Sequence, residues 1–215
     1  CHMIERTYMG VDERRDHSFR IPRPDLAATG SPDACTDCHT DRDAAWAEAE
    51  IAARFPAGRQ TEPHHATVFA AARLSPQLEV ADLAAIAQDT GKPGIVRATA
   101  IELLGGAMDP EAAARIGALL DNPDPVVRRA VTGALAALPP AARYAVLRPA
   151  LSDPARTVRE GAGKALLDAA TLPEVMADPA FQAALAEWQE ALSLRADFPE
   201  THLQIGGAAL TFRNF

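Results

Sequence analysis

One sequence pattern recurs every 31 residues through the second half of the chain. It consists of a Val-Arg pair that is followed by small and apolar residues and then by a leucine. The pattern occurs at Val96-Arg97 with Leu104, at Val127-Arg128 with Leu135, and at Val158-Arg159 with Leu166. An isolated unit of this size cannot bury its apolar face, whereas stacked units can. The spacing therefore predicts an array of repeats in which valine enters the core and arginine supports the neighbouring unit.

A second apolar segment precedes each of these pairs. The three segments span 80–89, 110–120 and 141–151, and Ala85, Ile116 and Leu147 keep the same spacing within them. An Asp-Pro, Asn-Pro or Lys-Pro turn separates the two segments of each unit. The chain has 47 alanines among 215 residues, which favours helix over strand. We therefore predict an all-α fold, a solenoid of helical hairpins, with the many Asp and Glu side chains on solvated helix faces.

The repeats resemble known helical-repeat families. The Val-Arg pattern resembles short HEAT-like repeats, which we assign to 78–176. The Ala-Leu pair of 191–192, the proline turn at 197–199 and the Leu-x-x-Gly of 203–206 resemble a tetratricopeptide repeat, which we assign in part to 177–215. Both likenesses imply protein–protein contacts. The net charge of −8 argues against nucleic acid as a partner, and the chain has no apolar run long enough to span a membrane.

Residues 1–77 differ from the repeats, because they contain all three cysteines and five of the six histidines. We expect an extended path at 20–25, where two prolines lie one residue apart, and short helices at 33–39, 43–55 and 63–74. A loop-rich region of this size has little core of its own. It needs a stabilising metal or cofactor.

The sharpest motif of this region is Cys35-Thr36-Asp37-Cys38-His39. C-x-x-C-H is the attachment signature of c-type haem. Two cysteines on one helical turn reach the two vinyl groups of a porphyrin, and the adjacent histidine binds the iron. Three alternatives remain: a structural zinc site, which needs a fourth ligand, a thioredoxin-like redox pair, which needs a βαβ context, and a simple disulfide.

The order of motifs in residues 1–43 resembles multihaem cytochromes c. Cys-His-Met at the start, Asp-His-Ser-Phe-Arg at 16–20 and then Cys-x-x-Cys-His are similar to the haem region of pentahaem nitrite reductases and their octahaem relatives. The likeness is greatest to multihaem cytochromes that carry HEAT-like and tetratricopeptide repeats after their haems. The chain has Ile4 where many of these relatives have proline. We expect it to be a fragment of a longer protein.

This resemblance implies roles for individual residues. Cys35 and Cys38 would hold the haem through thioethers, and His39 would be the proximal ligand. Further ligand candidates are Cys1 and His2, as the remainder of a second, truncated haem site, and His17, His64 and His65, as distal ligands. The chain would then carry at least one haem c and transfer electrons to a redox partner protein or a neighbouring haem domain. Covalent haem attachment occurs outside the cytoplasm, which implies a periplasmic location.

No recognisable catalytic motif accompanies these residues, so we expect an electron-transfer module rather than a catalytic site. The sequence leaves open whether this segment belongs to a multihaem oxidoreductase. The alternative is a scaffold of HEAT-like and tetratricopeptide repeats without redox function, whose Cys/His head binds a metal ion.

Overall fold

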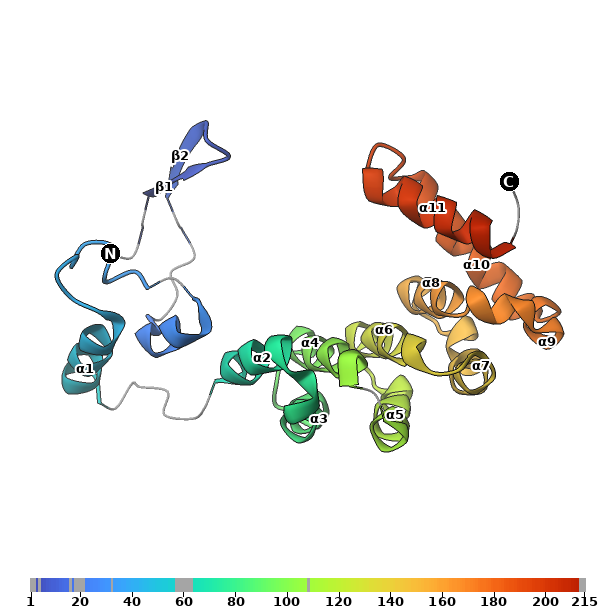
Figure 1. The fold of residues 1–215 in the computed structure, drawn as a ribbon, viewed down its shortest axis with the longest axis horizontal. Helices are drawn as coiled ribbons and strands as arrows, with labels where there is room; N and C mark the ends of the chain where they lie inside the picture. Colours follow the sequence, from blue (N-terminus) through green and yellow to red (C-terminus); the bar gives the residue numbers. More distant parts are fainter. Residues whose placement is uncertain are drawn as a thin grey trace. The chain divides into compact units, whose positions relative to one another are not determined.

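The structure is a computed structural model that describes residues 3, 5–15, 17, 22–31, 33–56, 64–107 and 109–212. It divides into two compact units, Cys1–Ala70 and Ala71–Phe215. Helices make up most of the described residues, as the all-α prediction requires (Figure 1). The strands and α-helices are β1 (Glu5–Tyr8), β2 (Asp12–Arg15), α1 (Ala44–Arg54), α2 (His65–Leu74), α3 (Val80–Gln88), α4 (Gly94–Leu104), α5 (Pro110–Gly117), α6 (Pro125–Ala134), α7 (Pro140–Leu147), α8 (Arg156–Ala165), α9 (Pro173–Met176), α10 (Pro179–Ser193) and α11 (Pro199–Phe212).

Short 3-10 helices extend or connect these elements. They are η1 (Pro24–Thr29), η2 (Pro76–Leu78), η3 (Gly105–Ala107), η4 (Ala118–Asp121), η5 (Leu135–Ala137), η6 (Arg148–Ser152) and η7 (Asp168–Thr171). The predicted extended path at 20–25 is wrong at its end, because Pro24 is the first residue of η1. Proline suits this position, since its missing N–H would have no partner in the first turn.

The antiparallel hairpin of β1 and β2 was not predicted. Its eight residues are all exposed, and they pair from Glu5 with Arg15 to Tyr8 with Asp12. Met9 and Gly10 form the turn with φ angles of 53° and 74°, the left-handed region in which glycine is favoured. Its strands lack the alternation of apolar and polar residues that identifies a half-buried strand in a sequence.

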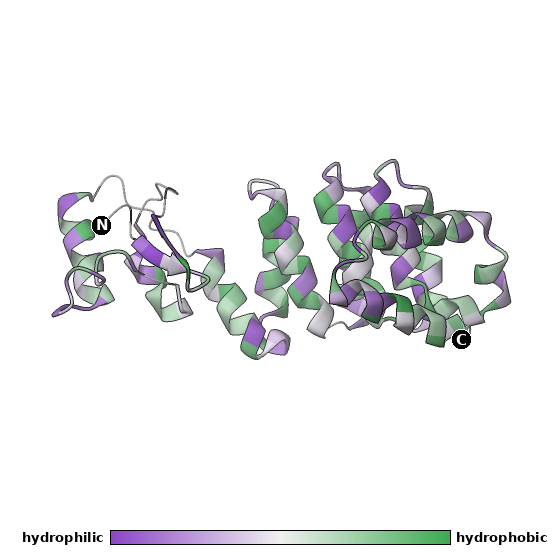
Figure 2. Cartoon of the chain, turned by 90° about the horizontal axis from the view of Figure 1, so that it is seen from above, coloured by the Kyte–Doolittle hydropathy of each residue, from purple (hydrophilic) through white to green (hydrophobic). Residues whose placement is uncertain are grey.

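The second unit consists of two rows of helices. In Figure 1, α4 and α6 lie in one row and α3, α5 and α7 in the other. Each helix of the first row packs on the next, from α4 to α6, α8 and α10. The helices carry both hydrophobic and hydrophilic residues (Figure 2), and their apolar sides form the core. The fully buried core residues with the largest side chains are Leu83, Ile101, Leu104, Ile116, Val127, Val131, Leu135, Leu147, Val158, Leu166, Val175 and Phe181.

The predicted repeat register is confirmed in the later units, where Val127 and Val158 are completely buried. It is wrong in the first unit, because Val96 is only half-buried and Ala85 is exposed. The buried face of α3 is formed instead by Leu83 and Ala87, which lie 29 residues before Ala112 and Ile116 of α5. The first hairpin is therefore two residues shorter between its helices than the next one.

Candidate functional site

The Cys-x-x-Cys-His motif forms a single hydrogen-bonded turn. The amides of Cys38 and His39 both donate to the carbonyl of Cys35, at 3.2 and 3.0 Å. Asp33 begins this turn, because its carboxylate accepts the amides of Cys35 at 2.9 Å and Thr36 at 3.3 Å. The helix predicted for 33–39 is thus shortened to a turn over 34–38. Both thiols and the imidazole project from one short segment with a fixed backbone.

The two thiols differ in their surroundings. Cys35 is half-buried and Cys38 is exposed, and both are free thiols. Burial raises the pKa of the Cys35 thiol, and the neighbouring Asp33 carboxylate raises it further. Reactive cysteines of redox motifs have a lowered pKa. The direction of the shift at Cys35 therefore argues against the thioredoxin-like alternative, and the only sheet among the described residues is the two-stranded hairpin.

An apolar groove of about 180 Å³ lies between this turn and one face of α1. Cys35 and His39 line one side of it. The opposite side is formed by α1 side chains at helical spacing and by Phe55, the residue after the helix; the α1 residues are Trp46, Ala47, Glu50, Ile51 and Arg54. Asp43 caps α1 by accepting the amide of Trp46 at 2.8 Å, which fixes the start of the helix against the turn. The groove joins the thiol and imidazole to an apolar wall.

None of the remaining ligand candidates that the structure describes lines this groove. Cys1 and His2 lie outside the described residues, and His17 is exposed. His64 and His65 stand at the start of α2, with ring centroids 4.0 Å apart. Among the described residues, no three His, Cys, Asp or Glu side chains gather as a metal-binding group.

The structure distinguishes His64 from His65 as candidate ligands, a choice that the sequence could not make. Nδ1 of His64 accepts the amide of Ala66 at 3.1 Å and so caps α2. A histidine that binds a metal through Nε2 carries its proton on Nδ1, and such binding would cost His64 this cap. His65 instead packs on Phe69, with ring centroids 5.4 Å apart. Of the two, His65 is the one whose ligation leaves the cap of the helix intact.

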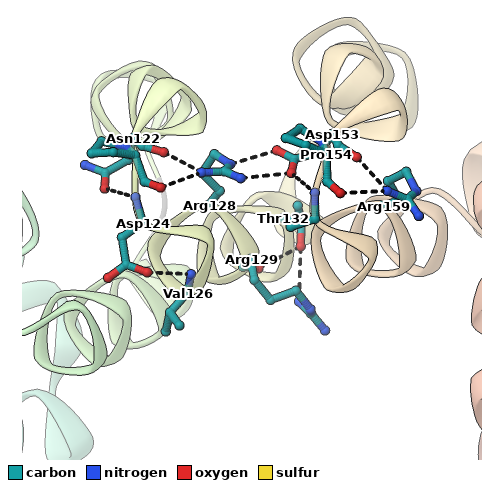
Figure 3. Close-up of polar contacts among 11 residues, drawn as sticks. Asn122, Asp124, Val126, Arg128, Arg129, Thr132, Asp153, Pro154 and Arg159 are labelled. Atoms are coloured by element: carbon teal, nitrogen blue, oxygen red, sulfur yellow. Dashed lines mark hydrogen bonds and ion pairs between the residues drawn. The ribbon is translucent and has the colours of Figure 1, made fainter.

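The second unit carries a polar ladder that connects successive repeats (Figure 3). Arg128 donates to both carboxylate oxygens of Asp153, at 2.7 and 2.9 Å, and to the carbonyls of Asn122 and Pro123. Arg159 repeats this arrangement one unit later. It donates to the carbonyl of Asp153 at 2.7 Å and to both carboxylate oxygens of Glu187, at 2.8 and 2.6 Å.

This ladder confirms that arginine supports the neighbouring unit at two of the three Val-Arg pairs. In the first pair, Arg97 is buried and donates within its own hairpin, to the carbonyl of Ala87 at 2.9 Å. The expectation that Asp and Glu lie on solvated faces is wrong for Asp153, whose side chain is 9% exposed. The arginine-to-aspartate spacing of 25 residues, repeated by Arg143 and Asp168, is the sequence signal that could have revealed these pairs.

Acid is expected to weaken the repeat unit through these carboxylates. The hydrogen bonds from Arg128 and Arg159 hold the pKa of Asp153 and of Glu187, respectively, below the usual values. A carboxyl group with a lowered folded-state pKa stabilises the fold above its unfolded-state pKa, and this contribution is lost as the pH falls through the folded-state value. Urea unfolding between pH 6 and pH 2 should show stability falling below about pH 4. Asp153→Asn should flatten that fall, whereas Asp121→Asn at an exposed position should leave it unchanged.

A wide groove of about 460 Å³ lies on the first row of helices, between α4 and α6. Small residues form most of its lining, together with Ile95 and the charged side chains Glu102 and Arg129. Ile95 is 66% exposed, so an apolar side chain faces outward beside the groove. None of the helices that the structure describes is both long and apolar enough to cross a lipid bilayer.

Two rows of helices, a 31-residue repeat and an arginine ladder across the turns together characterise the second unit. Residues 80–167 match the family model of HEAT repeats. No curated protein and no solved structure matches the chain. HEAT repeats form solenoids whose extended surfaces bind proteins. The match therefore supports an α-solenoid of HEAT-type hairpins over residues 80–167, a kind of repeat that is commonly used for protein interaction.

Proposed function

We propose that the first unit binds haem c covalently and transfers electrons, and that the HEAT repeats dock a protein partner. The observation that carries this proposal is the turn of Cys35, Cys38 and His39 beside an apolar groove. Two thiols and one imidazole on one short turn are the donor set that c-type haem requires.

The residues of the turn fit such a group. Cys35 and Cys38 would hold it through thioethers, and His39 would bind the iron. The exposed positions of Cys38 and His39 leave these groups accessible for attachment. The bound haem would supply an iron that cycles between its ferric and ferrous states. The apolar side chains of the groove, among them Trp46 and Ile51, would exclude water from one edge of that group.

Electron transfer is favoured over catalysis because the first unit contains further histidines that could bind the haem iron besides His39. A haem with histidine on both sides has no open position for a substrate, so it passes electrons rather than transforming a ligand. His65 is our first choice for the second histidine, because His64 caps α2. His17 is the other candidate. Because c-type haem is attached outside the cytoplasm, the proposal includes an extracytoplasmic location for the protein.

A second candidate function is favoured by the family match. The HEAT repeats by themselves support an interaction scaffold without redox function. Its partner would contact the groove between α4 and α6, where exposed apolar and charged side chains lie together. In this case Cys35, Cys38 and His39 would bind a metal ion or have no ligand.

The proposal is tested by producing the chain with a c-type maturation system and recording its reduced pyridine haem spectrum. We expect a c-type band in the parent protein and its complete loss in the Cys35→Ser/Cys38→Ser double variant. Thr36→Ala is the matched control, since residue 36 occupies a variable position of the motif and its side chain is no haem ligand. The proposal would be contradicted if the parent protein contained no haem, or if the double variant contained as much haem as the parent. The interaction scaffold without redox function would then be the supported interpretation.

A further inference from the structure

The indole of Trp46 lies directly beside the imidazole of His39. Their ring centroids are 4.8 Å apart, and the two rings are tilted by 55°. Trp46 stands in the first turn of α1, and its amide donates to the carboxylate of Asp43 at 2.8 Å. The helix cap therefore fixes the backbone from which the indole extends. The helix and the Cys-x-x-Cys-His turn meet through this ring pair.

A cation also lies near the same indole. The guanidinium carbon of Arg42 lies 5.8 Å from the centroid of the Trp46 ring. An arginine within about 6 Å of an aromatic centroid is attracted to the ring face. Trp46 itself is half-buried, and its neighbour Ala47 is 2% exposed. Contacts with both His39 and Arg42 therefore restrict the orientation of the indole.

The groove beside these rings is too small to enclose a large planar ligand. Its volume of about 180 Å³ lies below the range of about 300–1,000 Å³ that is usual for pockets enclosing drug-sized ligands. It is also open at its far end, where Phe55 is 64% exposed. A groove of this size and composition can receive the edge of an apolar macrocycle, with the remainder lying outside it.

We propose that the α1 groove seats one edge of the haem, and that Trp46 is a positioning residue that orients His39 and shields the part of its ring that the indole contacts from water. This inference rests on the proposed function. It adds a binding surface and a residue outside the Cys-x-x-Cys-His motif. The ring contact restricts rotation of the imidazole, and the apolar wall lowers the polarity around the site.

The potential of the haem reports this role. Solvent exposure and contacts beyond the direct ligands set the reduction potential of haem iron. Water stabilises the ferric form, which carries the higher charge. Trp46→Ala would expose the part of the His39 ring that the indole contacts and should shift the midpoint potential downward. Trp46→Phe retains an aromatic wall and should keep the potential near that of the parent.

The test compares covalently loaded Trp46→Ala, Trp46→Phe and Trp188→Phe proteins by spectroelectrochemical titration. Trp188 is the matched control, because it is 6% exposed within α10 of the other compact unit. We expect full haem content in all three and a lower potential in Trp46→Ala alone. An unchanged potential in Trp46→Ala, or an equal shift in Trp188→Phe, would overturn the inference while haem attachment still stood. Absence of haem from the parent would instead overturn the proposed function, and the inference with it.

Discussion

Arg128→Met is expected to lower the free energy of unfolding of the repeat unit by about 3 kcal/mol, because it leaves the charge of Asp153 buried without its partner. The two side chains are only 11% and 9% exposed. The guanidinium makes four hydrogen bonds, two to the carboxylate of Asp153 in the turn before α8 and two to the carbonyls of Asn122 and Pro123 in the turn before α6. The methionine fills much of the same volume but provides no donor. The two turns that Arg128 joins would lose their connection.

Urea unfolding followed by circular dichroism at neutral pH would measure this loss. Arg115→Met is the matched control, since Arg115 pairs with Glu111 on the surface of α5, where both side chains are at least half exposed. Such a pair contributes about 0–0.5 kcal/mol. Equal effects of the two substitutions would contradict the ladder as a stabilising element.

A second large effect is expected at Gly163, where α8 approaches α10. A Cβ at this position would lie 3.0 Å from the carbonyl carbon of Ala184 and 3.1 Å from its oxygen. Backbone atoms cannot turn aside as a side chain can, so the helices must separate. We expect Gly163→Ala to destabilise by about 1 kcal/mol and Gly163→Leu by about 3 kcal/mol, although alanine is the better helix former.

Gly207→Ala is the control, for which we expect a change in stability of the opposite sign. A Cβ at Gly207 in α11 would meet nothing within 4 Å. The substitution should therefore stabilise by about 0.5–1 kcal/mol through helix propensity alone. Thermal and urea unfolding of the three variants would decide the matter. Stabilisation by Gly163→Ala would show that α8 and α10 do not pack closely at this point.

The repeat architecture could be predicted because its core recurs at a constant interval. Val127, Val158 and the three spaced leucines all lie in the core, as the spacing requires. The exposure of Ala85 could not be predicted in this way. The first hairpin is shorter by two residues, which changes the face of its first helix that is buried without changing the composition of that helix. The hairpin of β1 and β2 was missed for a different reason. Ion pairs such as Glu5 with Arg15, rather than an apolar face, accompany its pairing.

Part of the candidate site could likewise be predicted from the sequence, and part could not. Residue type and spacing suffice to identify Cys35, Cys38 and His39, since the chemistry of attachment is contained in five consecutive residues. The contact between His39 and Trp46 depends on how α1 folds back on the turn, which no local pattern indicates. The choice between His64 and His65 as a ligand likewise depends on a single hydrogen bond at the start of α2.

The most direct test of covalent haem attachment in the first unit is the mass of the peptide that contains both Cys35 and Cys38. The protein would be matured together with a known c-type cytochrome, digested and analysed by mass spectrometry. We predict that this peptide carries the added mass of one haem, bound through both cysteines. Unmodified Cys35 and Cys38, in a preparation where the accompanying cytochrome has received its haem, would contradict the account.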